Sequence, residues 1–168
     1  MLTKVLIANR GEIAVRIIRA CAEMGIRSMA IYTEPDRYAL HVKRADEAYS
    51  LGEDPLAGYL DALRIVNLAL ETGCDAIHPG YGFLSENPEF AKLCEQNNVT
   101  FIGPSSDVIH KMGDKTQARD SMRAAGVPIT PGSDGNLSGI EEALLLANRV
   151  GYPVMIKATS GGGGRGIR

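Results

Sequence analysis

The stretch "KVLIANRGEIAVRIIRACAEMG", from Lys4 to Gly25, decides the class of fold because its hydrophobic period changes in the middle. Residues 5–8 form an apolar run typical of a buried strand, and the residues after Gly11 carry apolar side chains at helical spacing. A second apolar run, "RSMAIY" at residues 27–32, follows directly. A strand, a helix and another strand in this order predict a parallel β-α-β unit.

The same alternation continues along the chain. "YLDALRIVNLALETG" at residues 59–73 has a helical period, and "CDAIHPG" at residues 74–80 predicts a strand that ends in a turn. Asn87 followed by Pro88 predicts another helix, with asparagine as the N-cap and proline as the first helical residue. We therefore predict the α/β class, with a Rossmann-like open parallel sheet covered by helices on both faces.

The chain changes character near residue 112. Capping boxes predict two later helix starts, one pairing Asp114 with Gln117 and one pairing Ser138 with Glu141. Between them, "GVPITPGSDGNLSG" is dense in the residues of turns and hinges. We expect a first domain at residues 1–112 and the beginning of a second, truncated domain at residues 113–168.

Composition narrows the function classes. The 168 residues are 45% hydrophobic and carry a formal net charge of -2, so neither nucleic acid nor a membrane is an expected partner. The three cysteines are widely spaced, which predicts buried free thiols rather than disulfides or a zinc site. The apolar run at the start is too short and too soon interrupted by charge for a signal peptide, so we expect a cytoplasmic protein.

Two strand-end loops are candidates for ligand binding. The turn "ANRGE" contains only Gly11, so the glycine series of a dinucleotide site is missing and a tight structural turn is favoured. The loop "HPGYG" at residues 78–82 follows a strand, where an open α/β sheet forms its ligand crevice. A glycine- and proline-rich turn, with His78 satisfied by backbone, is an equally good interpretation.

The last residues combine a lysine with a run of glycines. In "YPVMIKATSGGGGRG" a strand period would place Met155 and Lys157 on one face, followed by Gly161–Gly164. The backbone N–H groups of such a run can cover phosphate oxygens, with Lys157 and Arg165 neutralising charge. We favour this nucleotide flap over a flexible linker or an RNA-binding patch.

Lys115 has two interpretations. It falls in the first turn of the helix predicted to begin at Asp114, where the helix dipole disfavours a cation. A bound phosphate would relieve this conflict, whereas a solvated surface lysine is the alternative.

Ordered motifs carry a resemblance to a known family. They are "ANRGEIAVRIIRA", "HPGYGFLSEN", "FIGPS", "MGDK", "GVPITPGS", "GYPVMIKA" and "GGGGRGIR". In order and spacing they resemble the biotin carboxylases of the ATP-grasp superfamily, over residues 1–168. The chain looks like the biotin carboxylase subunit of either an acetyl-CoA carboxylase or a pyruvate carboxylase.

The resemblance implies a ligase reaction and a set of binding residues. ATP activates bicarbonate as carboxyphosphate, and the carboxyl group passes to biotin held on a carrier protein. The nucleotide-binding residues are then, by resemblance, Lys115, Lys157, Gly161, Gly162, Gly163 and Gly164, with Met155 and Ile167 as walls for the adenine. Tyr81 and Gly82 match a loop that borders the bicarbonate and biotin pocket.

Further partners also follow from the resemblance. They are Mg²⁺, a biotin carboxyl carrier protein or domain, a carboxyltransferase subunit and a second copy in a homodimer. Family members are longer, and the missing part supplies the Mg²⁺ ligands and the general base, so no catalytic or metal-binding residue is expected within residues 1–168. We expect this N-terminal fragment to be inactive alone. Another ATP-grasp carboxylate–amine ligase and a non-catalytic assembly module are the alternatives.

Overall fold

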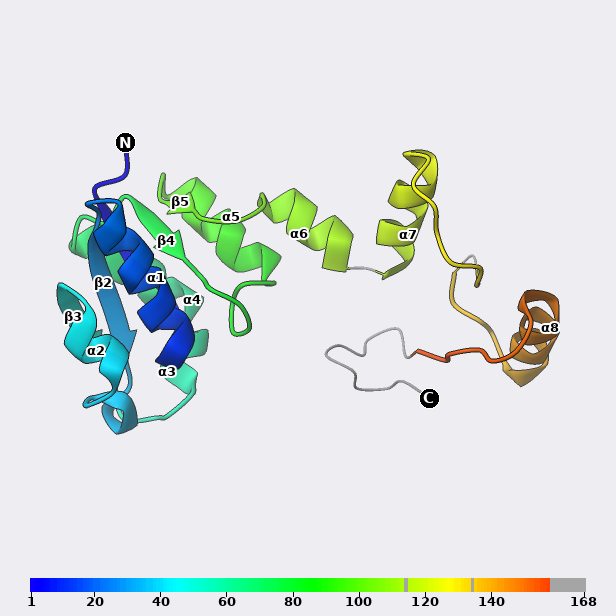
Figure 1. Ribbon diagram of the computed structural model, residues 1–168, viewed down its shortest axis with the longest axis horizontal. Coiled ribbons are helices and arrows are strands. Elements are labelled where there is room, and N and C mark those ends of the chain that lie inside the picture. Colours follow the sequence, from blue (N-terminus) through cyan, green and yellow to red (C-terminus); the bar gives the residue numbers. More distant parts are fainter. Residues whose placement is uncertain (114, 134, 158–168) are drawn as a thin grey trace. The chain divides into compact units, whose positions relative to one another are not determined.

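The chain forms two compact units, Met1–His110 and Lys111–Arg168, in a computed structural model that describes residues 1–113, 115–133 and 135–157. In the first unit a parallel sheet lies between two layers of helices (Figure 1). Its strands are β1 (Lys4–Ile7), β2 (Arg27–Tyr32), β3 (Glu47–Ser50), β4 (Ala76–His78) and β5 (Thr100–Phe101). Its helices are α1 (Gly11–Glu23), the 3-10 turn η1 (Glu34–Asp36), α2 (Leu40–Arg44), α3 (Ala57–Leu60), α4 (Ala62–Glu71) and α5 (Pro88–Gln96).

The strand order β3-β2-β1-β4-β5 confirms the predicted α/β class. β1 pairs in parallel with β2, where Lys4 lies opposite Arg27, and with β4, where Ile7 lies opposite His78. The chain builds the sheet outward from β1 in one direction and then, after β3, in the other. The boundary between β1 and β4 is therefore the topological switch point of the sheet.

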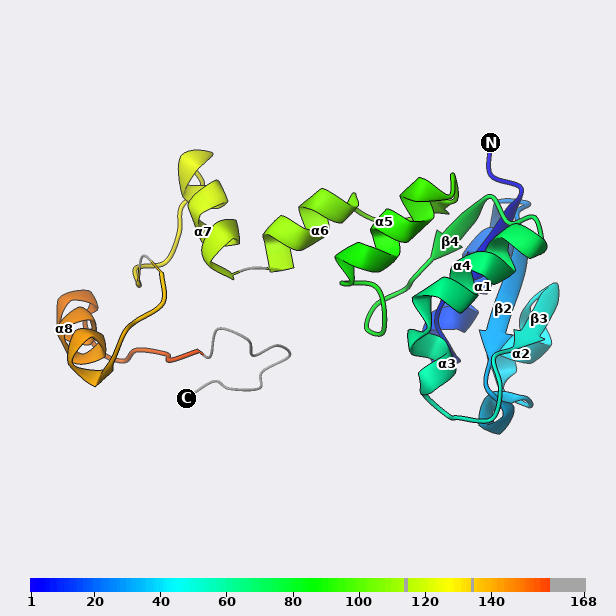
Figure 2. The same cartoon turned by 180° about the vertical axis from the view of Figure 1, so that it is seen from behind.

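Alternate residues of β1 enter two different cores because side chains of a strand point to opposite faces. Val5 and Ile7 pack in the cluster that contains the buried face of α1. Leu6 and Ala8 pack in the cluster that contains the buried residues of α4 and α5. Seen from behind, α4 and α5 cover the face opposite to α1 (Figure 2). All three cysteines are buried and free, as predicted.

A carboxylate fixes the amino-terminal end of β1. Asp75, in the turn before β4, accepts hydrogen bonds from the Thr3 hydroxyl (2.6 Å), the Thr3 N–H (2.6 Å) and the Lys4 N–H (2.8 Å). These hydrogen bonds lower the pKa of Asp75 from its usual 3.8 to about 2, because they stabilise the charged form. This end of the sheet lies opposite the strand-end loops and contributes to stability.

One predicted helix is in fact two. The single helix expected over residues 59–73 is interrupted at Asp61, which separates α3 from α4. The Asp61 carboxylate accepts a hydrogen bond from the Arg64 N–H at 3.0 Å and so caps α4. An aspartate competes with the helix for backbone donors, and here the cap prevails over the hydrophobic period. The N-cap predicted at Asn87 is confirmed, since its side chain accepts from the Glu89 and Phe90 N–H groups.

Helices dominate the regular structure that is described beyond α5. They are α6 (Ser106–Gly113), α7 (Lys115–Ala124) and α8 (Ile140–Val150). The capping partner predicted for Ser138 is wrong: its hydroxyl donates to Glu142 at 2.6 Å, not to Glu141. The cap of α8 is Gly139, which has no side-chain acceptor, and Glu142, the third helical residue, accepts from the N–H and the hydroxyl of Ser138 before the cap, so no reciprocal box forms. Asp114 lies outside the described residues.

The strand predicted around Met155 is wrong for the part of it that is described. Within residues 154–157 only Lys157 is assigned to a bridge, and no continuous strand forms. Met155 and Ile156 are both exposed, at 64% and 62%, so the expected alternation of faces is missing too. A strand needs neighbours for its backbone hydrogen bonds, and the other regular elements described in this unit are helices. No helix within the described ranges is long and apolar enough to cross a bilayer.

Candidate functional site

Two loops meet at the carboxyl end of the sheet, at the switch point. The turn 9–12, whose last two residues begin α1, follows β1, and the loop 79–83 follows β4. Because β1 and β4 are neighbours, these segments lie side by side although some 70 residues separate them in sequence. Ligands of open α/β sheets bind in the crevice at this position, so this edge is the candidate site of the first unit.

Asn9 joins the two loops. Its side chain is buried, with the residue 1% exposed, and its amide nitrogen donates to the carbonyl oxygens of Pro79 (2.7 Å) and Tyr81 (2.9 Å). Its own side-chain oxygen accepts from the Arg10 N–H at 2.9 Å. A buried amide with all these partners defines the position of both backbones.

Gly80 allows this close approach. A Cβ built there would lie 2.7 Å from the Asn9 amide nitrogen and 2.7 Å from the Ile13 methyl carbon, which is closer than real atoms pack. Its φ of +67° is also in the left-handed region that favours glycine. The glycine at this position is therefore required by both space and backbone conformation.

Tyr81 and Gly82, predicted to border the substrate pocket, lie on the exposed side of this loop. The Tyr81 side chain is 66% exposed, and its hydroxyl donates to the Glu12 carboxylate at 2.8 Å. This hydrogen bond raises the pKa of Tyr81, since it favours the protonated phenol. A fixed hydroxyl beside exposed backbone is an arrangement that can contact a polar ligand.

His78 is satisfied locally. Its Nδ1 accepts a hydrogen bond from the Gly80 N–H at 3.0 Å, and burial lowers the pKa of the ring. The imidazole is therefore neutral and helps to shape the turn. This geometry supports the structural interpretation of His78 over a role as a ligand or base.

A cluster under the loop, formed by Arg10, Asp36, Tyr59 and Phe83, was not predicted from the sequence. The Tyr59 and Phe83 rings stack with centroids 5.3 Å apart and planes 6° apart. The Arg10 guanidinium carbon lies 5.4 Å from the Tyr59 centroid and 5.7 Å from that of Phe83. Arg10 also pairs with the Asp36 carboxylate at 3.0 Å, and Tyr59 donates its hydroxyl to the same oxygen at 2.7 Å.

Two properties of this cluster bear on the loop. Burial alone would raise the pKa of Asp36, but the hydrogen bonds from Tyr59 and Arg10 outweigh it and the pKa is lowered. Asp36 is thus an anion that anchors the guanidinium. Phe83 has a φ of +45°, a conformation that costs a residue with a side chain about 1–2 kcal/mol. The contacts of its ring offset this strain.

The predicted nucleotide residues belong to the second unit. Lys115 is the first residue of α7. Lys157 is exposed, and Met155 is 64% exposed, so both side chains are open to a ligand. Gly161, Gly162, Gly163, Gly164 and Ile167 lie outside the described residues.

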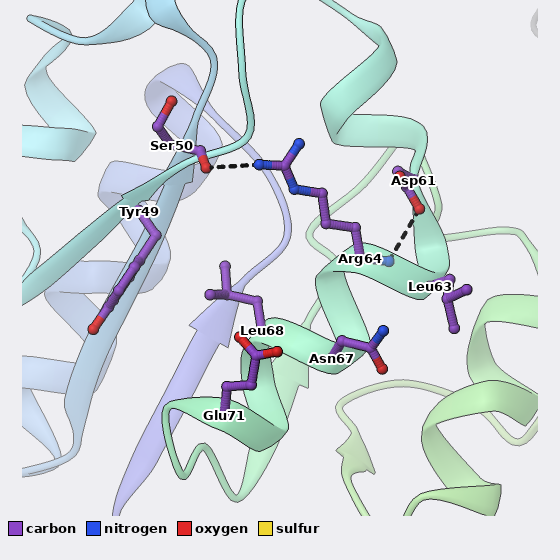
Figure 3. Close-up of a pocket in the computed structure, with 8 residues that line it drawn as sticks. All are labelled: Tyr49, Ser50, Asp61, Leu63, Arg64, Asn67, Leu68 and Glu71. Carbon is purple, nitrogen blue, oxygen red and sulfur yellow. Dashed lines mark hydrogen bonds between the residues drawn. The ribbon is translucent and has the colours of Figure 1, made fainter.

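A separate hollow of about 410 Å³ lies at the β3 edge, between β3 and α4 (Figure 3). The Arg64 side chain reaches from α4 to the Ser50 carbonyl, while Asp61 caps the helix through the Arg64 N–H. The Arg64 and Asp61 side chains in this hollow therefore already have structural partners. None of the predicted site residues line it.

Metal ligands do not gather within the part of the chain that the structure describes. No group of three or more His, Cys, Asp or Glu side chains there is arranged to hold an ion. The strand-end loops of the first unit are accordingly organised around hydrogen bonds and ring contacts.

Comparisons with known proteins show which families the sequence of this chain matches. Residues 1–109 match the family model of the biotin carboxylase N-terminal domain, and residues 114–168 match the ATP binding domain of the carbamoyl-phosphate synthase L chain. Biotin carboxylase 1 of Bacillus subtilis is 62% identical over 171 aligned residues, which cover 100% of this chain and 38% of the relative.

Solved structures give the same result. The biotin carboxylase domain dimer of Hydrogenobacter thermophilus 2-oxoglutarate carboxylase, in complex with MgADP, ADP and bicarbonate, has a TM-score of 0.93 at 61% identity and covers 100% of this chain and 37% of that one. A Campylobacter jejuni biotin carboxylase–β,γ-ATP complex has a TM-score of 0.94 at 47% identity, with 100% and 38% covered.

The chain spans little more than a third of the length of these relatives, between 36% and 38% for the first two curated ones. The family model of the N-terminal domain alone covers 109 of the 168 residues. The resemblance carried by the sequence motifs is therefore confirmed, and this chain belongs to the biotin carboxylase family.

Proposed function

We propose that the full-length protein containing this segment is an ATP-dependent biotin carboxylase, a ligase. The observation that carries the proposal is the high identity to biotin carboxylases over the whole of residues 1–168. In the first step an oxygen of bicarbonate attacks the γ-phosphorus of ATP, which gives carboxyphosphate and ADP. In the second step the ring nitrogen of biotin takes the carboxyl group, phosphate leaves, and phosphate accepts the nitrogen's proton.

The proposed nucleotide site belongs to the second domain. We assign the domains to residues 1–112 and 113–168, which is supported by the contact boundary at His110 and by the limits of the two family models. Lys115 and Lys157 neutralise phosphate charge, and Gly161–Gly164 cover the phosphates with backbone N–H groups. Met155 and Ile167 are the proposed walls for the adenine. Lys115 lies at a helix N-terminus, where phosphate oxygens are favoured.

The proposed role of the first domain is to border the substrate pocket. Tyr81 and Gly82 are exposed on a loop whose backbone is fixed by Asn9. Such a loop can present its groups without the entropic cost of ordering on binding. ATP with Mg²⁺ supplies the phosphoryl group and the charge compensation when bound, and we propose that the carboxylates that hold Mg²⁺ belong to the remainder of the protein.

The proposed partners follow the family. They are bicarbonate, a biotin carboxyl carrier protein or domain, a carboxyltransferase subunit and a second copy of the protein in a homodimer. The relative from Hydrogenobacter is a dimer with bicarbonate bound, which supports two of these. The three buried free thiols support a reducing compartment, and we propose the cytoplasm.

The test is nucleotide binding by the full-length protein. Lys157→Ala should weaken ATP binding measured by calorimetry by roughly tenfold or more, because a charge-assisted contact to phosphate is lost. Lys43→Ala, which removes an exposed lysine from α2 in the first unit, is the matched control and should leave the affinity unchanged. Equal ATP affinity in both variants would remove Lys157 from the site. Residues 1–168 alone should show no bicarbonate-dependent ATP hydrolysis.

A further inference from the structure

The loop 79–83 is held at three places by consecutive parts of the turn 9–12. Asn9 holds the backbone of the loop, and Glu12 holds the Tyr81 hydroxyl. Arg10 contacts the far end of the loop through the Phe83 ring. The contacts of Asn9 and Glu12 are hydrogen bonds to the loop. The contact of Arg10 is with the Phe83 ring, and neither Arg10 nor Phe83 is among the residues proposed to border the substrate pocket.

Arg10 is well fixed for such a role. Its guanidinium pairs with the Asp36 carboxylate at 3.0 Å and lies over the Tyr59 and Phe83 rings, which stack on each other. Asp36 is in turn held by the Tyr59 hydroxyl. The cation, the anion and the two rings therefore hold one another, and each loses partners if Arg10 is removed.

Phe83 transmits this contact to the residues that border the pocket. Gly80, Gly82 and Phe83 all have positive φ, at +67°, +70° and +45°, so the backbone on both sides of Tyr81 is in a left-handed conformation. The two glycines adopt it freely, whereas the strain at Phe83 is offset by contacts of its ring with the core cluster of α4 and α5, with the Tyr59 ring and with the Arg10 guanidinium. The Arg10 guanidinium is the support that the turn 9–12 gives to the Phe83 ring, and the backbone connects Phe83 directly to Gly82 and Tyr81.

We propose that Arg10 is a positioning residue, which acts through Phe83 to keep Tyr81 and Gly82 in the conformation that borders the substrate pocket. The proposal rests on the proposed function for the identity of the substrate, but the order of the loop can be measured without it. Arg10 would then affect the pocket for bicarbonate and biotin and leave the binding of ATP unchanged.

Arg37 supplies a matched control. It also pairs with a carboxylate, Glu34, at 2.6 Å, and lies over an aromatic ring, that of Tyr32, at 5.6 Å. Its side chain is 48% exposed and that of Arg10 is 40% exposed. These partners, Glu34 and Tyr32, are outside the loop 79–83, so Arg37→Ala removes the same kind of contacts without touching the loop.

The first experiment measures ADP release by the full-length protein with ATP, bicarbonate and varied free biotin. Arg10→Ala should raise the KM for biotin roughly 3- to 10-fold and leave the KM for ATP within about twofold, whereas Arg37→Ala should change neither. Phe83→Leu should reproduce the effect, and the double variant should be no worse than either single one, because both remove one contact. The proposal is overturned if the effects of Arg10→Ala and Phe83→Leu on the KM for biotin add in the double variant. It is also overturned if the KM for biotin is the same in Arg10→Ala and Arg37→Ala.

The second experiment follows the loop directly by amide hydrogen exchange. The Ser85 N–H is bonded to the Gly82 carbonyl at 2.9 Å, so it reports the position of Gly82. Its exchange should be roughly tenfold faster or more in Arg10→Ala and unchanged in Arg37→Ala. Equal protection in both variants contradicts the inference even where the wild-type protein has no biotin-dependent activity. If the wild-type protein has no biotin-dependent activity but exchange is faster in Arg10→Ala, the proposed function is contradicted and the positioning role of Arg10 is not.

Discussion

Helices α1 and α8 have similar amphipathic sequences, but apolar side chains of α1 are buried, whereas none of those of α8 is buried. In the first unit, α1 buries Ile17 and Ile18 at 7% and 5% exposure against the sheet. In α8, Ile140 and Leu145 remain 80% and 72% exposed, and no described residue from 111 to 157 is buried. The hydrophobic period makes both segments helical, but a core requires a facing surface as well, and only the first unit supplies one among the residues described.

The largest expected effect tests this contrast with one substitution made twice. Leu6→Ala removes a side chain that is fully buried in the core, so it should lower the free energy of unfolding by about 2–5 kcal/mol. Leu145→Ala in α8 should change it by less than about 0.5 kcal/mol. Urea unfolding of residues 1–168, followed by circular dichroism, measures both. Similar losses for the two variants would mean that α8 belongs to the same cooperative core.

Helix caps should show the same contrast on a smaller scale. Asn87→Ala removes two hydrogen bonds to the first turn of α5 and should cost about 1 kcal/mol in the same unfolding experiment. Ser138→Ala removes the hydroxyl that donates to Glu142 before α8, and should leave the main transition unchanged. An effect of Ser138→Ala as large as that of Asn87→Ala would contradict the difference between the units.

The smallest expected difference between the two units is in how the stability of each depends on pH. The folded-state pKa of Asp75 is about 2, below the usual 3.8, so its stabilising effect is complete above the usual value and is lost as pH falls toward 2. Asp75→Asn should therefore flatten the dependence of the urea midpoint on pH over this range. Hydrogen bonds from Ser138 also lower the pKa of Glu142. Glu142→Gln should nevertheless leave the slope as in the wild type, because no residue described between 111 and 157 is buried and we expect this unit to add little to the main transition. Equal slopes in wild type and Asp75→Asn would show that the carboxylate does not act as described.

Much of the first unit could be predicted from sequence period alone. The strands at residues 4–7, 27–32 and 76–78 and the helix at residues 11–23 follow their hydrophobic patterns closely. β3 and β5 could not be predicted in this way, since β5 has only two residues and β3 is half exposed at the sheet edge. The break at Asp61 was missed because a single capping hydrogen bond outweighed a continuous helical period.

The candidate site was predictable only in outline. Position at a strand end indicated the loop 79–83, but nothing local in the sequence indicated that Arg10 would meet Tyr59 and Phe83. Those contacts join segments about 50 and 73 residues apart, and they depend on the strand order rather than on any motif. The strand predicted at residues 154–157 was wrong as well, since within these residues only Lys157 makes a bridge.

Gly80 and Asn9 have a consequence for how substitutions in this family are interpreted. Because a Cβ at position 80 would fall on the Asn9 amide and on Ile13, a side chain at Gly80 displaces Asn9 and releases the Pro79 and Tyr81 carbonyls at the same time. Single-substitution scans would score positions 9 and 80 as two separate essential residues. They share a steric constraint, so their effects should be strongly non-additive, although the φ of +67° and the contact with Ile13 penalise a side chain at position 80 whatever residue occupies position 9.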